Sequence, residues 1–200
     1  MSLFVNSNPG ASFEPIPAGV HAAICCTLVD LGTQYNETFK NSSRKVLIGW
    51  EIPDETYEYD GEVKPRTITQ KYTASLNEKS NLRKDLAAWR GRDFTQDELA
   101  RFDLRNIVGK ACLLNIIHRE QNGTVYANIA SITPMPRGMA AVELSAAPLV
   151  FDLDNATDQD IDLLPKRYAE IIRESEEYKQ RKSIQPPVMI PLDDEEDLPF

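Results

Sequence analysis

Lysines, arginines and flat aromatic rings alternate through the middle of the chain, and these residue types together suit a nucleic acid strand. Cations neutralise phosphates, and an aromatic ring offers a face to an unstacked base, worth about 1–3 kcal/mol per base. Seven residues are candidates for this chemistry: Lys45, Trp50, Arg66, Lys71, Tyr72, Arg119 and Tyr126. They predict a groove that holds a single strand without reading its base sequence, and stacking alone does not separate DNA from RNA.

Each ring in this set has an alternative place in a core. Trp50 shares the parity of Ile48 along a strand, so burial explains its position as well as base stacking does. Tyr72 shares parity with Ile68 but also with Arg66, which favours exposure. Both roles therefore stay open for Trp50, while exposure is the prediction for Tyr72.

The cysteines and histidines, which often act as catalytic groups or metal ligands, do not have the spacing that such sites need. Cys25, Cys26 and Cys112 form no C-x-x-C pair, and His21 and His118 have no ligand-spaced neighbours. A structural zinc site needs three or four ligands, so neither a metal nor another cofactor is expected. No P-loop, dinucleotide-binding or nucleophile-elbow motif occurs, which predicts that the protein is not an enzyme.

Charge is divided unevenly between the two parts of the chain. Residues 1–140 hold 16 basic and 16 acidic residues, whereas residues 141–200 hold 6 and 15 and so carry the whole net charge of −9. Between Lys64 and Arg119 the balance is 12 basic to 6 acidic. This division predicts a near-neutral body with a basic segment, followed by an acidic appendage.

The periodicity of apolar residues predicts the elements that would position the candidates. Strands are expected over 20–31, 45–52, 66–74, 111–119 and 124–133, with Asn122-Gly123 as a hairpin turn. Helices are expected over 77–89 and after Thr95, which forms a capping-box pattern with Glu98. Three strands, a helical insertion and a two-stranded hairpin follow the element order of the OB-fold, a five-stranded Greek-key barrel.

The predicted fold class is therefore mainly β with a helical insertion, plus a C-terminal helix and an acidic tail. The expected divisions are an N-terminal arm (1–16), an OB-fold nucleic-acid-binding domain (17–137), a linker (138–157), a charged helix (158–182) and a flexible acidic tail (183–200). Pro165 is expected to start or kink the charged helix.

The last eight residues combine acid and apolar character: Asp193, Asp194, Glu195, Glu196, Asp197, Leu198, Pro199 and Phe200. Five consecutive acids repel one another and favour an extended chain. A terminal proline and ring suit a partner pocket that has an apolar hole and a basic rim. Docking to a partner is the prediction, with a solubilising terminus as the alternative.

This ending resembles the tail of bacterial single-stranded DNA-binding proteins and their phage counterparts, through the acids followed by Asp-Leu-Pro-Phe. The resemblance implies a role in DNA replication and recombination, in which the terminal Pro-Phe recruits partner enzymes. The body departs from the standard bacterial form, with helical residues between Asn77 and Phe102 and no Gly/Gln-rich linker, and looks more like a phage or prophage protein. No DNA-contact residue carries over, and the family's tetramer is in doubt.

The expected partners are thus single-stranded DNA, replication and recombination proteins, and a second copy of the chain, with a dimer favoured. No run of about 18 apolar residues and no secretory signal pattern occur, which predicts a cytoplasmic protein without membrane contact, in a bacterial host cell if it is phage-encoded. Two alternatives stay open: an OB-like adaptor that contacts proteins but not DNA, and a metal-dependent nuclease.

Overall fold

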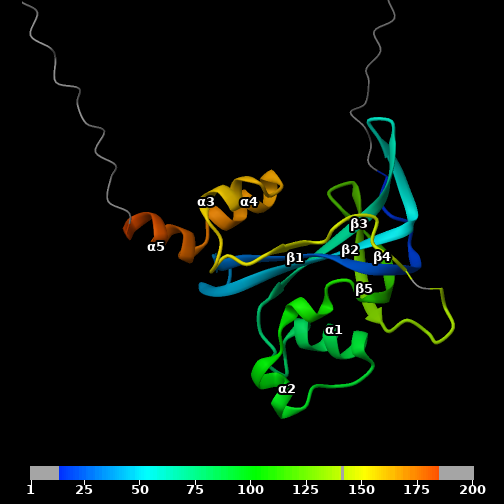
Figure 1. The fold of residues 1–200 in the computed structure, drawn as a ribbon, viewed down its shortest axis with the longest axis horizontal. Coiled ribbons are helices and arrows are strands. Elements are labelled where there is room, and N and C mark those ends of the chain that lie inside the picture. The colour runs from blue at the N-terminus through cyan, green and yellow to red at the C-terminus, as the bar shows by residue number, and fades with distance from the viewer. Residues whose placement is uncertain (1–13, 141, 185–200) are drawn as a thin grey trace, which may run out of the picture.

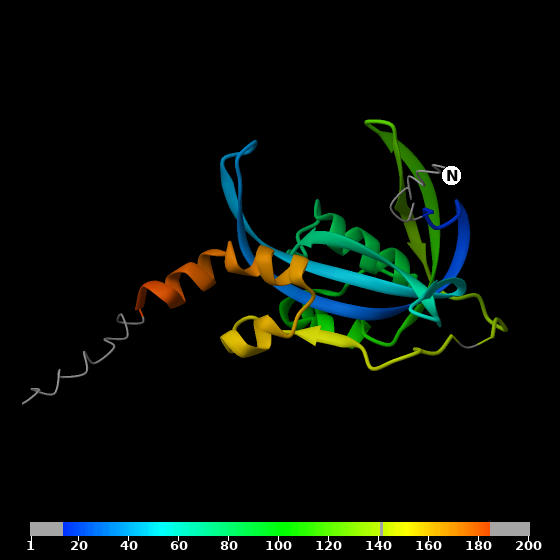
Figure 2. The same cartoon turned by 90° about the horizontal axis from the view of Figure 1, so that it is seen from above.

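The body of the protein is a strongly curled antiparallel sheet, seen edge-on in Figure 2 as an open half-barrel. The computed structural model describes residues 14–140 and 142–184. The strands are β1 (Gly19–Asn36), β2 (Asn41–Tyr59), β3 (Glu62–Thr73), β4 (Ala111–Gln121) and β5 (Thr124–Thr133), in the order β3-β2-β1-β4-β5. The sequence prediction of a mainly β body, with three strands before the helical insertion and two after it, is confirmed.

The first two strands are much longer than their apolar segments. The bounds expected for these strands, 20–31 and 45–52, are too short, because β1 and β2 continue as a paired ribbon up to Asn36 and Asn41. Cross-strand hydrogen bonds satisfy the backbone there whatever the side chains are, so polar residues suffice for an exposed ribbon. The hairpin between β2 and β3 turns at Asp60 and Gly61, both at positive φ, as expected for a two-residue turn.

A helical insertion joins β3 to β4, as the sequence predicts. It consists of α1 (Asn81–Arg90), α2 (Gln96–Arg101) and the 3-10 turn η1 (Leu104–Ile107). The capping box is confirmed, because the Thr95 hydroxyl accepts from the Glu98 N–H and the Glu98 carboxylate accepts from the Thr95 N–H. Helix α1 buries Leu82, Leu86 and Trp89 against the sheet and so closes one side of the curl (Figure 1).

The main core lies between the concave face of the sheet and this insertion. Trp50 of β2 is completely buried there, with its ring centroid 5.9 Å from that of Trp89. Ile16, at the end of the expected N-terminal arm, also belongs to this core, and His118 bonds to its carbonyl oxygen. The rest of the arm, residues 1–13, lies outside the described residues.

The chain after residue 148 builds a second layer on the opposite face of β1 and β2. It contains β6 (Leu149–Phe151), which runs parallel to β1, and the helices α3 (Asp158–Asp162), α4 (Lys166–Arg173) and α5 (Glu176–Ile184). The prediction of a single charged helix over 158–182 is therefore wrong, because three shorter helices occupy this region. The linker expected over 138–157 contains the strand β6. Pro165 precedes α4, where its missing N–H costs no hydrogen bond.

A second core joins this layer to the sheet. Val29 and Leu31 of β1 and Leu47 of β2 pack against residues of the C-terminal elements, chiefly Phe151, Leu153, Ile161, Leu164, Ala169 and Ile172. The central parts of β1 and β2 are thus buried on both faces. The edge strand β3 keeps its outer face exposed, since Thr67, Thr69, Lys71 and Thr73 alternate with the buried Ile68 and Tyr72.

Candidate nucleic-acid interface

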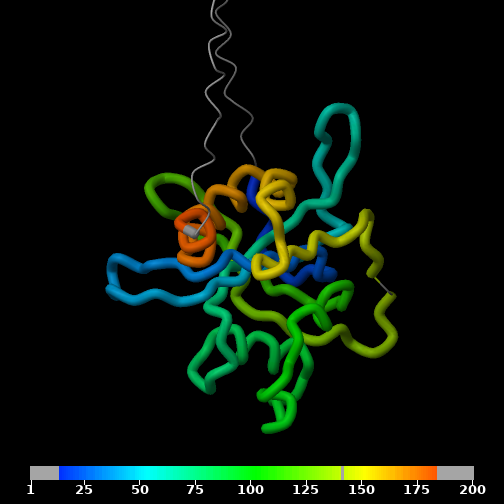
Figure 3. Tube along the Cα trace, turned by 60° about the vertical axis from the view of Figure 1, so that its left-hand side comes forward, coloured from blue at the N-terminus to red at the C-terminus, as the bar shows by residue number. Residues whose placement is uncertain are grey.

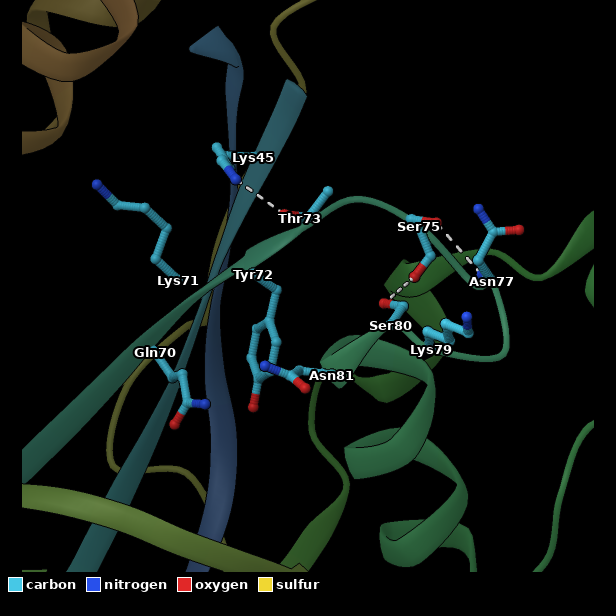
Figure 4. Close-up of a pocket in the computed structure, with 10 residues that line it drawn as sticks. All are labelled: Lys45, Gln70, Lys71, Tyr72, Thr73, Ser75, Asn77, Lys79, Ser80 and Asn81. Atoms are coloured by element: carbon cyan, nitrogen blue, oxygen red, sulfur yellow. Dashed lines mark hydrogen bonds between the residues drawn. The ribbon is translucent and has the colours of Figure 1, made fainter. Parts of the chain in front are cut away.

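An open hollow of about 460 Å³ lies where the end of β3 meets the start of α1 (Figure 4). Lys45, Lys71 and Lys79 contribute positive charge to it, and none of the described residues that line it is acidic. The other lining residues are polar or offer a hydroxyl: Gln70, Tyr72, Thr73, Ser75, Asn77, Ser80 and Asn81. Three lysines among neutral hydrogen-bonding groups make this the described hollow best suited to a chain of phosphates.

Two of the predicted cations, Lys45 and Lys71, lie together on one side of β3 (Figure 4). Their placement follows from the register, in which Lys45 of β2 pairs with Thr73, and Leu47 pairs with Lys71. Lys45 Nζ donates to the Thr73 hydroxyl at 2.8 Å, which orients the ammonium without neutralising its charge. The structure therefore brings these two candidate lysines onto one surface.

Lys71 is held in a positive environment. Burial, followed by the charges of Arg167 and Lys45, lowers the pKa of its ammonium below the ordinary lysine value. Among the described residues Lys71 forms no ion pair. An approaching phosphate would therefore relieve repulsion that the folded protein leaves uncompensated.

The two rings nearest these lysines do not face the surface. Trp50 is fully buried, and Tyr72 is only 4% exposed and points from β3 toward α1, where its hydroxyl donates to Asp85 at 2.8 Å. Burial and the neighbouring Asp85 raise the pKa of the Tyr72 phenol well above its usual range. Neither ring has a free face on which a base could stack. The prediction that Tyr72 is exposed is therefore wrong, and of the two roles left open for Trp50 the structure shows burial in the core.

The remaining three candidates lie away from the hollow. Arg66 is opposite Ile52, toward the other end of the β2–β3 ladder, and its guanidinium donates to the carbonyl oxygens of Thr56 and Glu14. Arg119 and Tyr126 face each other across the β4–β5 hairpin and are exposed. The structure therefore brings Lys45 and Lys71 together, places Arg119 beside Tyr126 elsewhere, and ties Arg66 to the backbone.

Exposed rings occur near the hairpin tips, and sequence reasoning named Tyr126 among them but missed Tyr35 and Phe39. Tyr35 and Phe39 are 61% and 76% exposed on the β1–β2 hairpin, and Tyr126 is 50% exposed on the β4–β5 hairpin. Both hairpins project to the same side of the molecule in Figures 2 and 3. The sequence signal for these exposed rings was the presence of Tyr35 and Phe39 in a segment that is otherwise polar.

Most other cations of the insertion are already paired. Arg83 binds Asp93, and Arg90 and Arg92 both bind Glu98, so this helical face presents far less positive charge than its sequence suggests. Pairing with Arg92, the Thr95 N–H and Arg90 lowers the pKa of Glu98 strongly. The contrast separates these structural ion pairs from the unpaired lysines beside β3.

The carboxylates of Asp30, Asp152 and Asp154 approach within 4.8 Å of one another, which is the geometry a cation site would need. Arg44 already bonds to Asp30 and lies 2.8 Å from an Asp154 oxygen, so the guanidinium occupies the position of a counter-ion. This arrangement is explained as a structural ion-pair network, and it offers no support for the nuclease alternative.

No helix among the described residues is both long and apolar enough to cross a membrane. The predicted docking segment, residues 193–200, lies outside the described residues. A scan of protein-family models finds no match to this chain, and a search of curated proteins finds no similar sequence.

Proposed function

We propose that this protein binds single-stranded DNA without sequence preference, on an OB-like half-barrel. The central β1 pairs with both β2 and β4, and the helical insertion falls between β3 and β4, which agrees with the layout of an OB-fold. The outer surface of the second and third strands is the usual ligand face of that fold, and Lys45 and Lys71 lie on it.

The observation that carries the proposal is the hollow beside β3, whose lining contains three lysines and no acidic residue. A body with equal numbers of acidic and basic residues would be expected to pair them, as the insertion does. Unpaired cations along an exposed strand are what a sugar-phosphate backbone requires. The rings at the hairpin tips, Tyr35, Phe39 and Tyr126, supply stacking platforms in place of the buried Trp50 and Tyr72.

Residues 193–200 complete the proposal as a recruiting segment. Their five acids and the Leu-Pro-Phe triplet suit a basic-rimmed apolar pocket on a replication or recombination protein. A dimer of the chain remains part of the proposal as a second partner.

The test is a titration of fluorescently labelled oligo-dT with the full chain at several salt concentrations, followed by anisotropy. The expected result is binding whose logarithmic affinity falls linearly with the logarithm of salt concentration, because phosphate contacts release counterions. The double variant Lys45→Ala/Lys71→Ala should bind several-fold more weakly and with a smaller salt slope. The matched control is Lys179→Ala/Lys182→Ala, which removes two exposed lysines of α5 that pair with Glu174 and Asp158 on the other layer.

Absence of binding at low salt would overturn the proposal and favour the adaptor alternative. Metal-dependent cleavage of the labelled strand would instead favour the nuclease alternative.

A further inference from the structure

The two edges of the sheet differ in how they are protected. The strand order begins at β3 and ends at β5, and among the described residues no strand pairs with the outer edge of either. A free edge presents unpaired N–H and C=O groups to any other strand, so natural proteins usually place charges or proline there. The composition of each edge strand therefore shows whether that edge is built to stay free.

Strand β3 carries both kinds of protection. It contains the charged residues Glu62, Lys64, Arg66 and Lys71, and Pro65 lies among them. After a two-residue turn such as the one before β3, alternate residues direct their N–H away from the neighbouring strand. Pro65 occupies one of these outward positions, so its ring replaces an N–H that would otherwise be free at the edge.

Strand β5 carries neither kind of protection. It reads Thr-Val-Tyr-Ala-Asn-Ile-Ala-Ser-Ile-Thr and contains no charged residue, no proline and no glycine. The uncharged stretch extends beyond the strand, because no charged residue occurs between Glu120 and Arg137. More than half of the strand is β-branched or aromatic, which favours pairing with another strand. An edge of this composition invites aggregation unless something pairs with it.

The geometry of β5 leaves a row of backbone groups available for such a partner. Its turn also places two residues, Asn122 and Gly123, at positive φ. Val125, Ala127 and Ile129 therefore direct their N–H and C=O groups away from β4, and the register shift of the β4–β5 ladder comes only after Ile129. The hairpin projects from the body in Figure 2, and Val125 is 44% exposed.

We propose that the outer edge of β5 pairs antiparallel with β5 of a second copy of the chain, which forms a symmetric dimer through residues 124–129. Ala127 then lies opposite Ala127 of the second copy, and Val125 lies opposite Ile129. In this register each outward N–H meets an outward C=O, and the small alanine side chains lie at the symmetry axis. The dimer removes the unprotected edge from both copies.

The absence of charge favours a second copy as the occupant. Two chains that each carry a net charge of −9 repel one another, so a strip without charge is the surface on which they can meet. A strand that contains no charge also meets no like charge when it pairs with itself. The proposed function includes a dimer, and this inference rests on that part of it by naming the surface, without depending on DNA binding.

The test measures self-association of the full chain by sedimentation velocity over a wide range of protein concentrations. The wild type should reach a species of twice the chain mass of 22.6 kDa. Ala127→Pro removes the outward N–H at the centre of the pair in both copies and should raise the dimer dissociation constant about tenfold or more. Val125→Pro should weaken the dimer in the same way.

The matched control is Val63→Pro on the protected edge. Val63 and Val125 are each the second residue of an edge strand after a two-residue turn, and each lies opposite a glutamate of the neighbouring strand. Both substitutions replace an outward N–H by a proline ring. Val63→Pro should therefore leave the dimer dissociation constant at the wild-type value.

Hydrogen exchange on the wild type gives a second measurement, which does not depend on the folding of a variant. Amides of residues 124–129 should exchange more slowly as protein concentration rises, whereas those of residues 62–73 should exchange at a constant rate. Equal dissociation constants for the wild type, Ala127→Pro and Val125→Pro, or no concentration-dependent protection of β5, would overturn this surface. A wild type that stays monomeric would overturn the inference and the dimer of the proposed function, while oligo-dT binding is decided by its own titration.

Discussion

At the scale of single residues, two neighbours on β3 have opposite roles because successive side chains of a strand point to opposite faces. Lys71 stands on the outer face beside Lys45, while Tyr72 points inward and donates to Asp85. A cation and an aromatic residue that follow each other in the sequence therefore do not act on the same ligand. The cation can meet a phosphate, whereas the phenol holds the strand to α1.

Replacing Tyr72 with phenylalanine separates these roles. The change removes the hydroxyl that donates a hydrogen bond to the half-buried Asp85. The loss of this bond should lower the free energy of unfolding by about 1–2 kcal/mol. Oligo-dT affinity should stay at the wild-type value. Urea denaturation and anisotropy measure the two quantities. Tyr126→Phe is the control, since its exposed ring predicts a stability change within about 0.5 kcal/mol; a marked loss of affinity in Tyr72→Phe would contradict the assignment of Tyr72 to the core.

The three cysteines show how their surroundings decide reactivity. Burial is the largest influence on all three thiols, and it raises the pKa of Cys25 to about 12 and that of Cys26 and Cys112 above the ordinary value. Since the thiolate is the reactive form, these residues behave as small apolar side chains. All three cysteines are free in the structure, in which Cys25 and Cys112 are buried and Cys26 is partly buried.

At the scale of elements, the Glu177 carboxylate is one of the groups that join α5 to the β1–β2 hairpin, and Glu176 is another. Burial alone would raise the pKa of Glu177, but the hydrogen bonds from Thr33 outweigh it, and the pKa lies below its usual value. A carboxyl group with a lowered pKa in the folded state stabilises the fold above its unfolded pKa of about 4.3. That contribution is lost as pH falls through the lower, folded-state pKa.

Glu177→Gln should therefore destabilise the protein by about 1–2 kcal/mol at pH 7, because a charge-assisted pair of hydrogen bonds is lost. The difference from the wild type should shrink as the pH falls below about 4, where the wild-type carboxylate itself becomes protonated. Urea denaturation at several pH values measures both effects. Glu170→Gln is the control, since that carboxylate only faces Lys166 at 3.9 Å on the surface. A constant difference across the whole pH range would show that Glu177 does not act through its charge.

At the scale of the whole molecule, acidic and basic residues are separated along the chain. The segment 193–200 carries five of the acids, and the lysines beside β3 have no acidic partner among the described residues. A negatively charged segment on the same molecule can compete with phosphates for such a surface. Competition of this kind weakens with added salt, because salt screens the attraction between the acidic segment and the lysines.

Deletion of residues 193–200 should consequently tighten oligo-dT binding at low salt and leave the thermal midpoint unchanged. The gain in affinity should fade as salt is raised. Anisotropy of the shortened and full chains, measured side by side, tests this expectation. Identical affinities at low salt would exclude competition by the segment, although its role in docking partners would still stand to be tested by pull-down of replication proteins.

The sequence by itself determined the order of the five strands, the helical insertion and its capping box, because local periodicity and cap chemistry act over a few residues. It did not determine that Lys45 and Lys71 share a face, because this follows from the register between β2 and β3. It did not determine the long β1–β2 ribbon, whose polar residues are held by backbone pairing and by side-chain bonds to α5.

Only the tertiary structure decided which rings are buried and which cations remain free. Trp50 and Tyr72 face the core because the sheet curls around α1, a contact between segments far apart in the chain. Folding brings acids beside Arg83, Arg90 and Arg92 and pairs them, whereas Lys71 forms no ion pair among the described residues. Burial and charge pairing depend on distances in space, and strand periodicity specifies only the distances along one element.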